Sequence, residues 1–220
     1  MKSILIVLFW TILIIQPFEA LAQNFGIKAG LNISEMFIED DDGNLSDDYD
    51  SKAGLHFGLI AEYPINENLN FETGLLISQK GFKGSLEETL FGETLKADIL
   101  FKTLYLDIPL NAKAAHTISN KQVFGIFGPY IAIGLTGEYE SEFSYMGESE
   151  TDNEDINWGN DEDDDLRRLD YGLNAGAGIE INSIQFRVSY SLGLANVSAY
   201  RDSGTTMKHR VLSLSVAYMF

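Results

Sequence analysis

The sequence lacks cysteine and is poor in basic residues. Without cysteine the fold can depend on neither disulfides nor thiolate metal sites, and a lipid anchor on an N-terminal cysteine is excluded. Lysine and arginine number 15 against 33 aspartates and glutamates, so the net charge is −18. This balance argues against nucleic-acid binding, because phosphate contacts need clustered basic side chains. No proline-rich or serine-rich linker divides the 220 residues, so one domain is expected.

Long apolar runs are also missing, except at the N-terminus. Lys2 precedes the predominantly apolar run 4–15, and the small residues Ala20 and Ala22 follow it. A positive start, an apolar run and an Ala-x-Ala end are typical of a signal peptide. We therefore expect cleavage of residues 1–22 and a mature domain at 23–220. A membrane anchor is the alternative, but the run is shorter than the roughly 20 residues that a spanning helix needs.

The sequence instead alternates apolar residues with small or polar ones, which is the period-two signal of β-strands. Eight segments are assigned as strands: 25–34, 54–63, 69–78, 103–111, 123–136, 171–181, 184–194 and 212–220. Residues 123–136 are apolar on both faces and are assigned from their length, glycines and flanking turns. Short connections alternate with loops of about 12 to 30 residues. The pattern predicts an all-β fold, an eight-stranded antiparallel up-and-down transmembrane β-barrel with periplasmic turns.

The polar face of the strands separates a membrane barrel from a soluble one such as a lipocalin. A solvent-facing surface should be rich in lysine and glutamate, but glycine, serine, asparagine and alanine dominate here. Small residues suit the crowded lumen of an eight-stranded barrel. Aromatic residues on the apolar face are typical of interfacial girdles: Phe25, Tyr63, Phe71, Tyr171, Tyr190, Tyr218 and Phe220. We therefore expect a protein of the bacterial outer membrane, surrounded by outer-membrane lipid, with the lipocalin fold as the alternative.

Several segments in order resemble the PorT-like outer-membrane β-barrel family, whose members are often labelled porin family: 25–32, 58–63, 104–110, 128–130, 176–178 and 216–220. The resemblance covers residues 23–220. It implies an eight-stranded outer-membrane barrel, inserted by the barrel-assembly machinery with help from a terminal aromatic residue such as Phe220. It implies little chemistry, and it does not extend to the acidic loop 139–167.

Eight titratable side chains fall on the predicted lumen face: Lys28, His56, Glu62, Glu72, Asp107, Lys113, Glu180 and Arg187. Opposite charges in a narrow lumen most simply form a buried ionic network, because each desolvated charge needs a partner. Glu180 is the diagonal neighbour of Arg187 across the turn at 182–183 and is its predicted partner, with Asp107 and Glu72 as the next candidates. The three histidines, His56, His116 and His209, show no spacing typical of a zinc site or a catalytic triad.

Acidic residues crowd into segments 39–50 and 138–165. Carboxylate and carbonyl oxygens are the ligands of Ca²⁺, so weak candidate ligands are Asp40, Asp42, Asn44, Asp161, Asp163 and Asp165. Neither run fits a twelve-residue EF-hand loop. The favoured interpretation is that the carboxylates of these loops are solvated and repel one another. Divalent cations could still bridge these loops loosely to lipid head groups, and no other cofactor is expected.

The predicted loop 139–167 is where we expect function, since binding residues concentrate on loops carried by a rigid scaffold. Its stretch 148–165 holds only Ile156 and Trp158 as large apolar residues, too few to form a core. We therefore expect a mobile, protease-sensitive extracellular segment. Trp158 is the predicted anchor for an extracellular or membrane protein partner, since a lone aromatic residue in a polar loop is typical of an interface hot spot.

Three functions remain open on the sequence. The favoured one is a barrel without catalysis that acts as a structural or binding protein through acidic external loops. A small porin-like channel is the alternative, although eight strands leave no open channel and inward Ile60, Leu76 and Tyr105 narrow the lumen. An outer-membrane enzyme is the second alternative. It requires Ser, His and Asp, or paired acids, together at the outer rim, and the sequence indicates no such set.

Overall fold

The computed structural model describes residues 24–40, 43–44, 49–90, 93–145, 148–161, 164–200 and 204–220. The predicted signal peptide, residues 1–22, lies outside the described residues. Strands dominate the described part: β1 (Asn24–Asp40), β2 (Gly43–Asn44), β3 (Tyr49–Asn66), β4 (Leu69–Leu90), β5 (Glu93–Ile118), β6 (Lys121–Tyr145), β7 (Glu148–Asp155), β8 (Leu169–Ile181), β9 (Ile184–Gly193) and β10 (Thr206–Met219). Over the same residues, no helix has the length and apolar character needed to cross a membrane.

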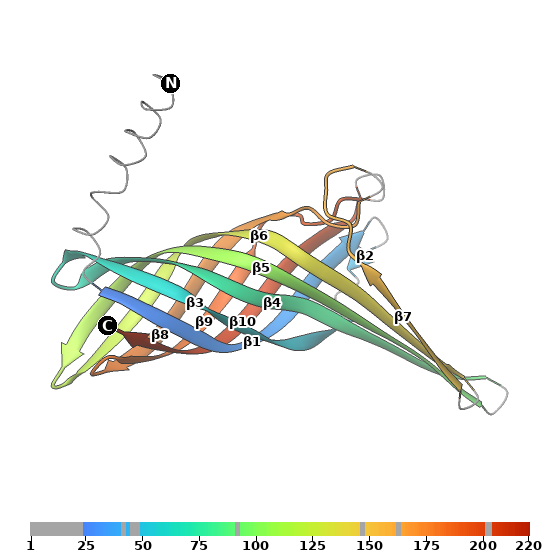
Figure 1. Cartoon of the computed structure of the whole chain (residues 1–220), viewed down its shortest axis with the longest axis horizontal. Coiled ribbons are helices and arrows are strands. Elements are labelled where there is room, and N and C mark those ends of the chain that lie inside the picture. Colours follow the sequence, from blue (N-terminus) through green and yellow to red (C-terminus); the bar gives the residue numbers. More distant parts are fainter. Residues whose placement is uncertain are drawn as a thin grey trace, which may run out of the picture.

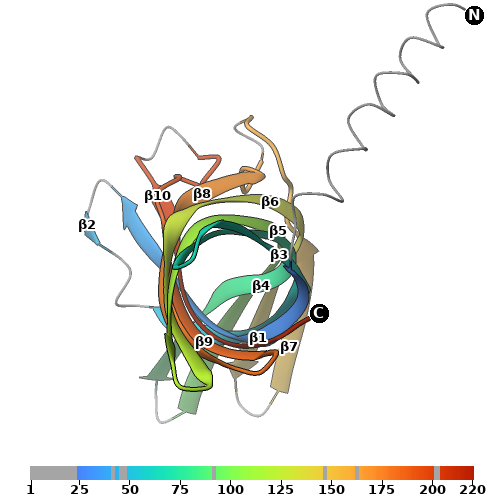
Figure 2. The same cartoon turned by 90° about the vertical axis from the view of Figure 1, so that its left-hand side faces the viewer.

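Among these strands, eight close into an antiparallel ring in the order β1, β3, β4, β5, β6, β8, β9, β10. β10 pairs back with β1 from Met219 opposite Gly26 to Thr206 opposite Glu39, and Figure 2 looks along the resulting barrel. Closure matters because an open sheet edge would leave unpaired backbone groups. The predicted eight-stranded antiparallel barrel is confirmed. The short strands β2 and β7 lie outside the ring and pair with β1 and β6.

Three two-residue turns connect strands at one end of the barrel, at 67–68, 119–120 and 182–183. Ser119 and Asn182 adopt left-handed backbone conformations, with φ of 58° and 56°, as tight hairpin turns require. The barrel strands end close together here, since the Phe220 amide donates to the Phe25 carbonyl at 2.7 Å. The long connections all lie at the opposite end (Figure 1).

The strands β4, β5 and β6 run well beyond their predicted ends, which corrects the expectation of long loops after the third and fifth strands. Their far ends and β7 form a four-stranded sheet, called here the extension: residues 83–90, 93–102, 138–145 and 148–155. Figure 1 shows it as a tapering limb that projects from the barrel. Apolar and polar residues alternate only weakly along these strands. Both faces of the extension contact water, so polar residues occur on both.

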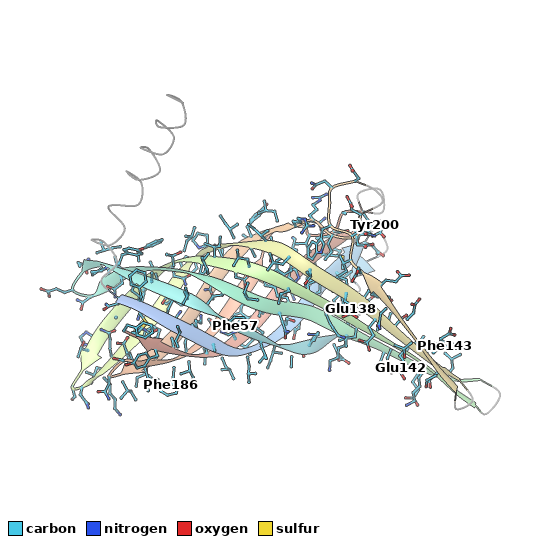
Figure 3. The ribbon with its side chains drawn as sticks, in the orientation of Figure 1. Phe57, Glu138, Glu142, Phe143, Phe186 and Tyr200 are labelled. Atoms are coloured by element: carbon cyan, nitrogen blue, oxygen red, sulfur yellow. The ribbon has the colours of Figure 1, made fainter. Side chains whose placement is uncertain are left out.

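The barrel is polar inside and apolar outside. Phe57 and Phe186 point away from the wall (Figure 3) and are 61% and 47% exposed. Asn32, Glu72 and Lys113 point inward and are at most 1% exposed. A soluble barrel would have the reverse arrangement, so the lipocalin alternative is wrong and the predicted lipid-facing surface is confirmed.

Candidate functional site

Charged side chains fill the lumen near the short-turn end. Lys113 Nζ lies 2.6 Å from Glu62 Oε1 and 3.6 Å from Glu180 Oε2. Gln185 Nε2 donates to the same two carboxylates, at 2.8 Å and 3.0 Å. The Lys113 ammonium also sits 4.3 Å from the centre of the Phe124 ring. Each of these buried polar groups therefore has a partner, as burial requires.

A second group crosses the middle of the lumen. Arg187 binds Glu72 through two hydrogen bonds, Nη1 to Oε1 at 2.7 Å and Nη2 to Oε2 at 2.5 Å. Asn111 and Gln185 add hydrogen bonds to Glu72 and Arg187 respectively. The predicted pairing of Arg187 with Glu180 is therefore wrong. A long side chain in a narrow barrel reaches the opposite wall, and strand register alone does not show which residue faces it there.

A third group lies nearer the long-loop end and contains residues that sequence reasoning missed. Lys80 Nζ lies 2.9 Å from Asp107 Oδ1 and 3.3 Å from Asp170 Oδ2. His209 Nδ1 is 3.3 Å from the same Asp170 oxygen, and Tyr130 donates to Asp170 at 3.3 Å. Lys80, Asp170 and His209 are at most 3% exposed.

Lys80, Asp170 and His209 were missed because each lies just beyond a predicted strand end. Each lies an even number of positions from the inward-facing residues of its strand, so its side chain points into the lumen as theirs do. Its register with the neighbouring strands agrees. Continuing the alternation by one to three residues past each predicted end would have placed all three inside the lumen.

A small polar cavity of about 50 Å³ lies beside the third group, and its lining includes Lys28, Asn32, His56, Lys80, Asp107 and Tyr130. By the volume that one water needs, it has room for about three waters. His56 Nδ1 lies 2.8 Å from Asn32 Oδ1, and Asn32 in turn donates to Ser78 Oγ at 2.9 Å. This space is a polar pocket within the lumen.

Buried apolar side chains lie in the lumen at the long-loop end and also among the polar groups. At the long-loop end, buried side chains form what we call the mouth cluster: Met36, Ile38, Phe82, Phe101, Ile156, Leu166, Ala195 and Val197. Ala115, Phe124 and Ile126 form a cluster toward the short-turn end. Ile60, Leu76, Ala217 and Met219 form another that reaches up between the polar groups, since Leu76 lies between Glu72 and Lys80 on β4. Ile156 and Leu166 belong to the mouth cluster, so the segment after β7 lies across the barrel end.

Trp158 packs into the barrel end, which corrects the expectation of an exposed anchor in a loop without structure. Its ring meets Tyr105 edge-on at 5.7 Å, and the Arg168 guanidinium lies 5.7 Å from the indole. Gly134 makes room for it, since a Cβ there would lie 2.2 Å from the indole. The preceding residues 148–155 are the regular strand β7.

The candidate calcium ligands lie in two separate segments. Asp40 Oδ1 accepts a hydrogen bond from the Gly43 amide at 3.1 Å. Asp165 Oδ2 accepts one from the Asn157 amide, and the Asp161 amide donates to Asp164, both at 2.8 Å. Asp42, Asp163 and the side chain of Asn44 lie outside the described residues. In the remainder of the chain, which the structure does describe, no three or more His, Cys, Asp or Glu side chains are grouped to hold a metal ion.

The Asp170–His209 pair resembles the acid and the histidine of a catalytic triad, but both side chains are buried. His209 is 1% exposed and Asp170 is fully buried. His56 hydrogen bonds in the middle of the lumen, and His116 is exposed near the short-turn end. A substrate would have to open the mouth cluster to reach His209, so we assign the pair to the lumen packing.

The extension stands beyond the apolar wall of the barrel. On the outward face of β5, Leu104 is followed by Lys102, which pairs in register with Glu138 on β6. Lys102 donates to Glu140, and this hydrogen bond raises the pKa of Lys102. From there β5 runs for about 30 Å, at about 3.3 Å per residue. The change from apolar to charged outward residues marks the edge of the lipid, and the extension lies outside it.

A closed ring with a polar lumen, an apolar exterior, short turns at one end and long connections at the other defines an outer-membrane β-barrel. The chain belongs to the family described as "Outer membrane protein beta-barrel domain", which matches residues 18–199. Its location is therefore the bacterial outer membrane. In barrels of this class the short turns face the periplasm and the long connections face the outside of the cell.

Two solved structures show low similarity to this chain. Ail, the attachment invasion locus protein of Yersinia pestis, in complex with the heparin analogue sucrose octasulfate, is 17% identical; the match covers 90% of this chain and 98% of Ail, with a TM-score of 0.36. Neisserial surface protein A (NspA) is 13% identical over 89% of this chain and 97% of NspA, with a TM-score of 0.40. A comparison with curated proteins found no match.

Proposed function

We propose that this protein is a non-catalytic, non-conducting outer-membrane barrel that binds partners through its extension. One observation carries the proposal. Leu86 and Phe143 are 55% and 48% exposed on a sheet that stands in water beyond the lipid. Large apolar groups exposed together outside the membrane cost free energy and commonly mark an interaction surface.

The packing of the lumen supports this choice over a channel. The mouth cluster covers the long-loop end, and ion pairs together with buried apolar clusters fill the lumen below it. The same packing supports the absence of catalysis, because Asp170, His56 and His209 are buried inside the lumen. The lumen then acts as the rigid scaffold that positions the extension.

Photocrosslinking on intact cells tests the proposal. A crosslinking amino acid at position 143 should capture a partner, whereas one at position 57, which faces lipid, should capture no protein. Absence of any adduct at position 143 would argue against binding by the extension. In planar bilayers the purified protein should give no stepwise conductance, and regular steps would favour the channel alternative.

The proposal includes how the protein reaches the outer membrane. We propose that residues 1–22 are removed on export, so that the mature domain is 23–220, and that the barrel-assembly machinery inserts it with help from Phe220. N-terminal sequencing of the membrane fraction should start at Gln23, and an intact Met1 would contradict cleavage. Membership in the narrower PorT-like group, and loose divalent-cation binding by the acidic residues, stay predictions.

A further inference from the structure

We propose that one face of the extension binds a cationic amphipathic polypeptide segment; this deepens, and rests on, the proposed function. The face in question continues the lumen wall and is called here the inner face. In its cross-strand rows, Leu86 lies opposite Ala97, Ala97 opposite Phe143, and Phe143 opposite Glu150. The side chains of each row point to the same side of the sheet, because directly paired residues share a face.

The inner face joins an apolar area to a row of carboxylates. Ile99 and Ala97 on β5 are half-buried between the exposed Leu86 on β4 and Phe143 on β6. β7 then places Glu150, Asp152 and Glu154 on the same side, opposite Phe143, Ser141 and Tyr139. The opposite side of β7 carries Ser149, Thr151, Asn153 and Asp155, next to Glu138, Glu140 and Glu142 of β6. Both sides of the sheet therefore carry acid, but the exposed large apolar residues of the described extension, Leu86 and Phe143, lie on the inner face.

The carboxylates of this row are not neutralised by neighbouring cations. Across the described ranges, the ion pairs within 4.0 Å on the extension are Lys96 with Glu87 and Lys102 with Glu140, both on the opposite side. Glu150, Asp152 and Glu154 are exposed and form none. Three like charges spaced along one strand repel one another. A partner that brings positive charge relieves this repulsion.

The geometry of the face selects an amphipathic partner. Three strands at about 4.8 Å spacing give an apolar width of about 10 Å, close to the diameter of an α-helix. A helix laid along the strands seats its apolar side on Leu86, Ala97 and Phe143. Lysine or arginine on its flank then reaches the carboxylates of β7. A second copy of this chain fits poorly, because its own inner face carries the same acidic row.

Fluorescence at labelled positions tests the binding and the face at once. Because the chain has no cysteine, Ser141→Cys on the inner face and Thr151→Cys on the opposite face each provide a single labelling site. The probe is a 14-residue Lys/Leu peptide with an amphipathic helical pattern, added to the protein in zwitterionic nanodiscs. We expect a saturable emission change from position 141 and a much smaller one from position 151. Equal changes at both positions would overturn the assignment to this face.

Matched variants and peptides separate charge from apolar contact. Combining Glu150→Gln, Asp152→Asn and Glu154→Gln should weaken binding by about tenfold or more, as should Leu86→Ser with Phe143→Ser. Glu142→Gln, on the opposite face beside Phe143 (Figure 3), should leave the affinity unchanged.

Peptide controls test the chemistry of the partner. A shuffled peptide of the same composition, and one with glutamate for lysine, should not bind. Raising the salt concentration should weaken binding.

The controls distinguish this inference from the proposed function. A protein without the extension gives the background from peptide binding to lipid, and heat-modifiable gel migration checks that each variant is folded. If position 143 captures a partner in cells but the peptide binds equally with and without the extension, the cationic segment is wrong and the binding function stands. If position 143 captures nothing and the peptide does not bind, both proposals fail.

Discussion

At the scale of single residues, the lumen depends on pairs that join opposite walls. The Arg187–Glu72 pair links β9 to β4, and both side chains are at most 5% exposed. Removing one member of a buried ion pair leaves the other charge without compensation, which is more costly than losing the contact itself. These pairs therefore determine which substitutions the barrel tolerates.

Arg187→Leu should destabilise the barrel by about 3–5 kcal/mol, because Glu72 is left buried without its cation. Combining it with Glu72→Gln should cost less than the sum of the two single changes. Urea unfolding in lipid vesicles measures both free energies. Glu180→Gln is the control: a larger coupling of Arg187 with Glu180 than with Glu72 would contradict the observed pairing.

Trp158 provides a spectroscopic test of the mouth. Gly134→Val should push the indole out of its site, because a Cβ there meets the ring at 2.2 Å. In protein starting at Gln23, Trp158 is the single tryptophan, so its emission should shift to the red and acrylamide quenching should increase. The overpacking should cost about 1–3 kcal/mol.

Gly125→Val on the same strand is the matched control, since the nearest atom to an added Cβ there is the Gly176 carbonyl oxygen at 3.8 Å. Its emission should remain that of the unaltered protein. Strong quenching of Trp158 in the unaltered protein would instead support the exposed anchor that the sequence indicated.

At the scale of elements, the extension and the mouth segment have different roles although they are adjacent in the chain. β7 pairs with β6 outside the ring, whereas Ile156 and Leu166 pack into the mouth cluster. Strand pairing in water is marginal on its own, and buried apolar contacts carry most of the stability. The extension should therefore be removable, and the mouth segment should not.

Replacing residues 85–98 and 142–151 each by Asn-Gly should leave the barrel folded. In the observed register Gly84 lies opposite Ile99 and Ser141 opposite Asp152, so a two-residue turn joins each pair. Heat-modifiable migration should be retained, and the free energy of unfolding should change by about 1 kcal/mol or less.

Replacing residues 156–166 by a Gly-Ser linker should cost about 2–5 kcal/mol, because it removes two buried side chains. Equal losses of stability for this variant and for the shortened extension would mean that the extension is part of the core.

At the scale of the whole molecule, the lipid determines which exposed apolar residues are essential. Val188 and Leu86 are 50% and 55% exposed, but Val188 lies on the barrel wall and Leu86 on the extension. The accessible area of the two side chains is similar and does not distinguish their roles. Their surroundings do, because Val188 contacts lipid and Leu86 contacts water.

Val188→Arg should destabilise the barrel by about 2–4 kcal/mol, the usual cost of arginine facing the middle of the lipid. Leu86→Arg should change the free energy of unfolding by less than about 0.5 kcal/mol, as surface substitutions do. Refolding into lipid vesicles under a urea gradient measures both. A large loss for Leu86→Arg would place the extension in the membrane and remove the basis of the proposed binding surface.

The sequence by itself determined the eight strands of the ring and, for all of them except 123–136, the side of the strand that meets lipid. In segments such as 184–194, lipid on one side and a crowded polar lumen on the other impose opposite chemistry on alternate residues, so the alternation is strong. In the extension water lies on both sides, the alternation weakens, and these strands were predicted as loop.

Only the tertiary structure decided the partners across the lumen and the position of Trp158. Local patterns identify neighbours along a strand and across one turn, such as Glu180 and Arg187. The meeting of Arg187 with Glu72, and of Lys80 with Asp170, depends on how the whole sheet curves and closes. The same closure brings Gly134 and Tyr105 beneath Trp158, because a barrel end offers an apolar site that a loop sequence does not reveal.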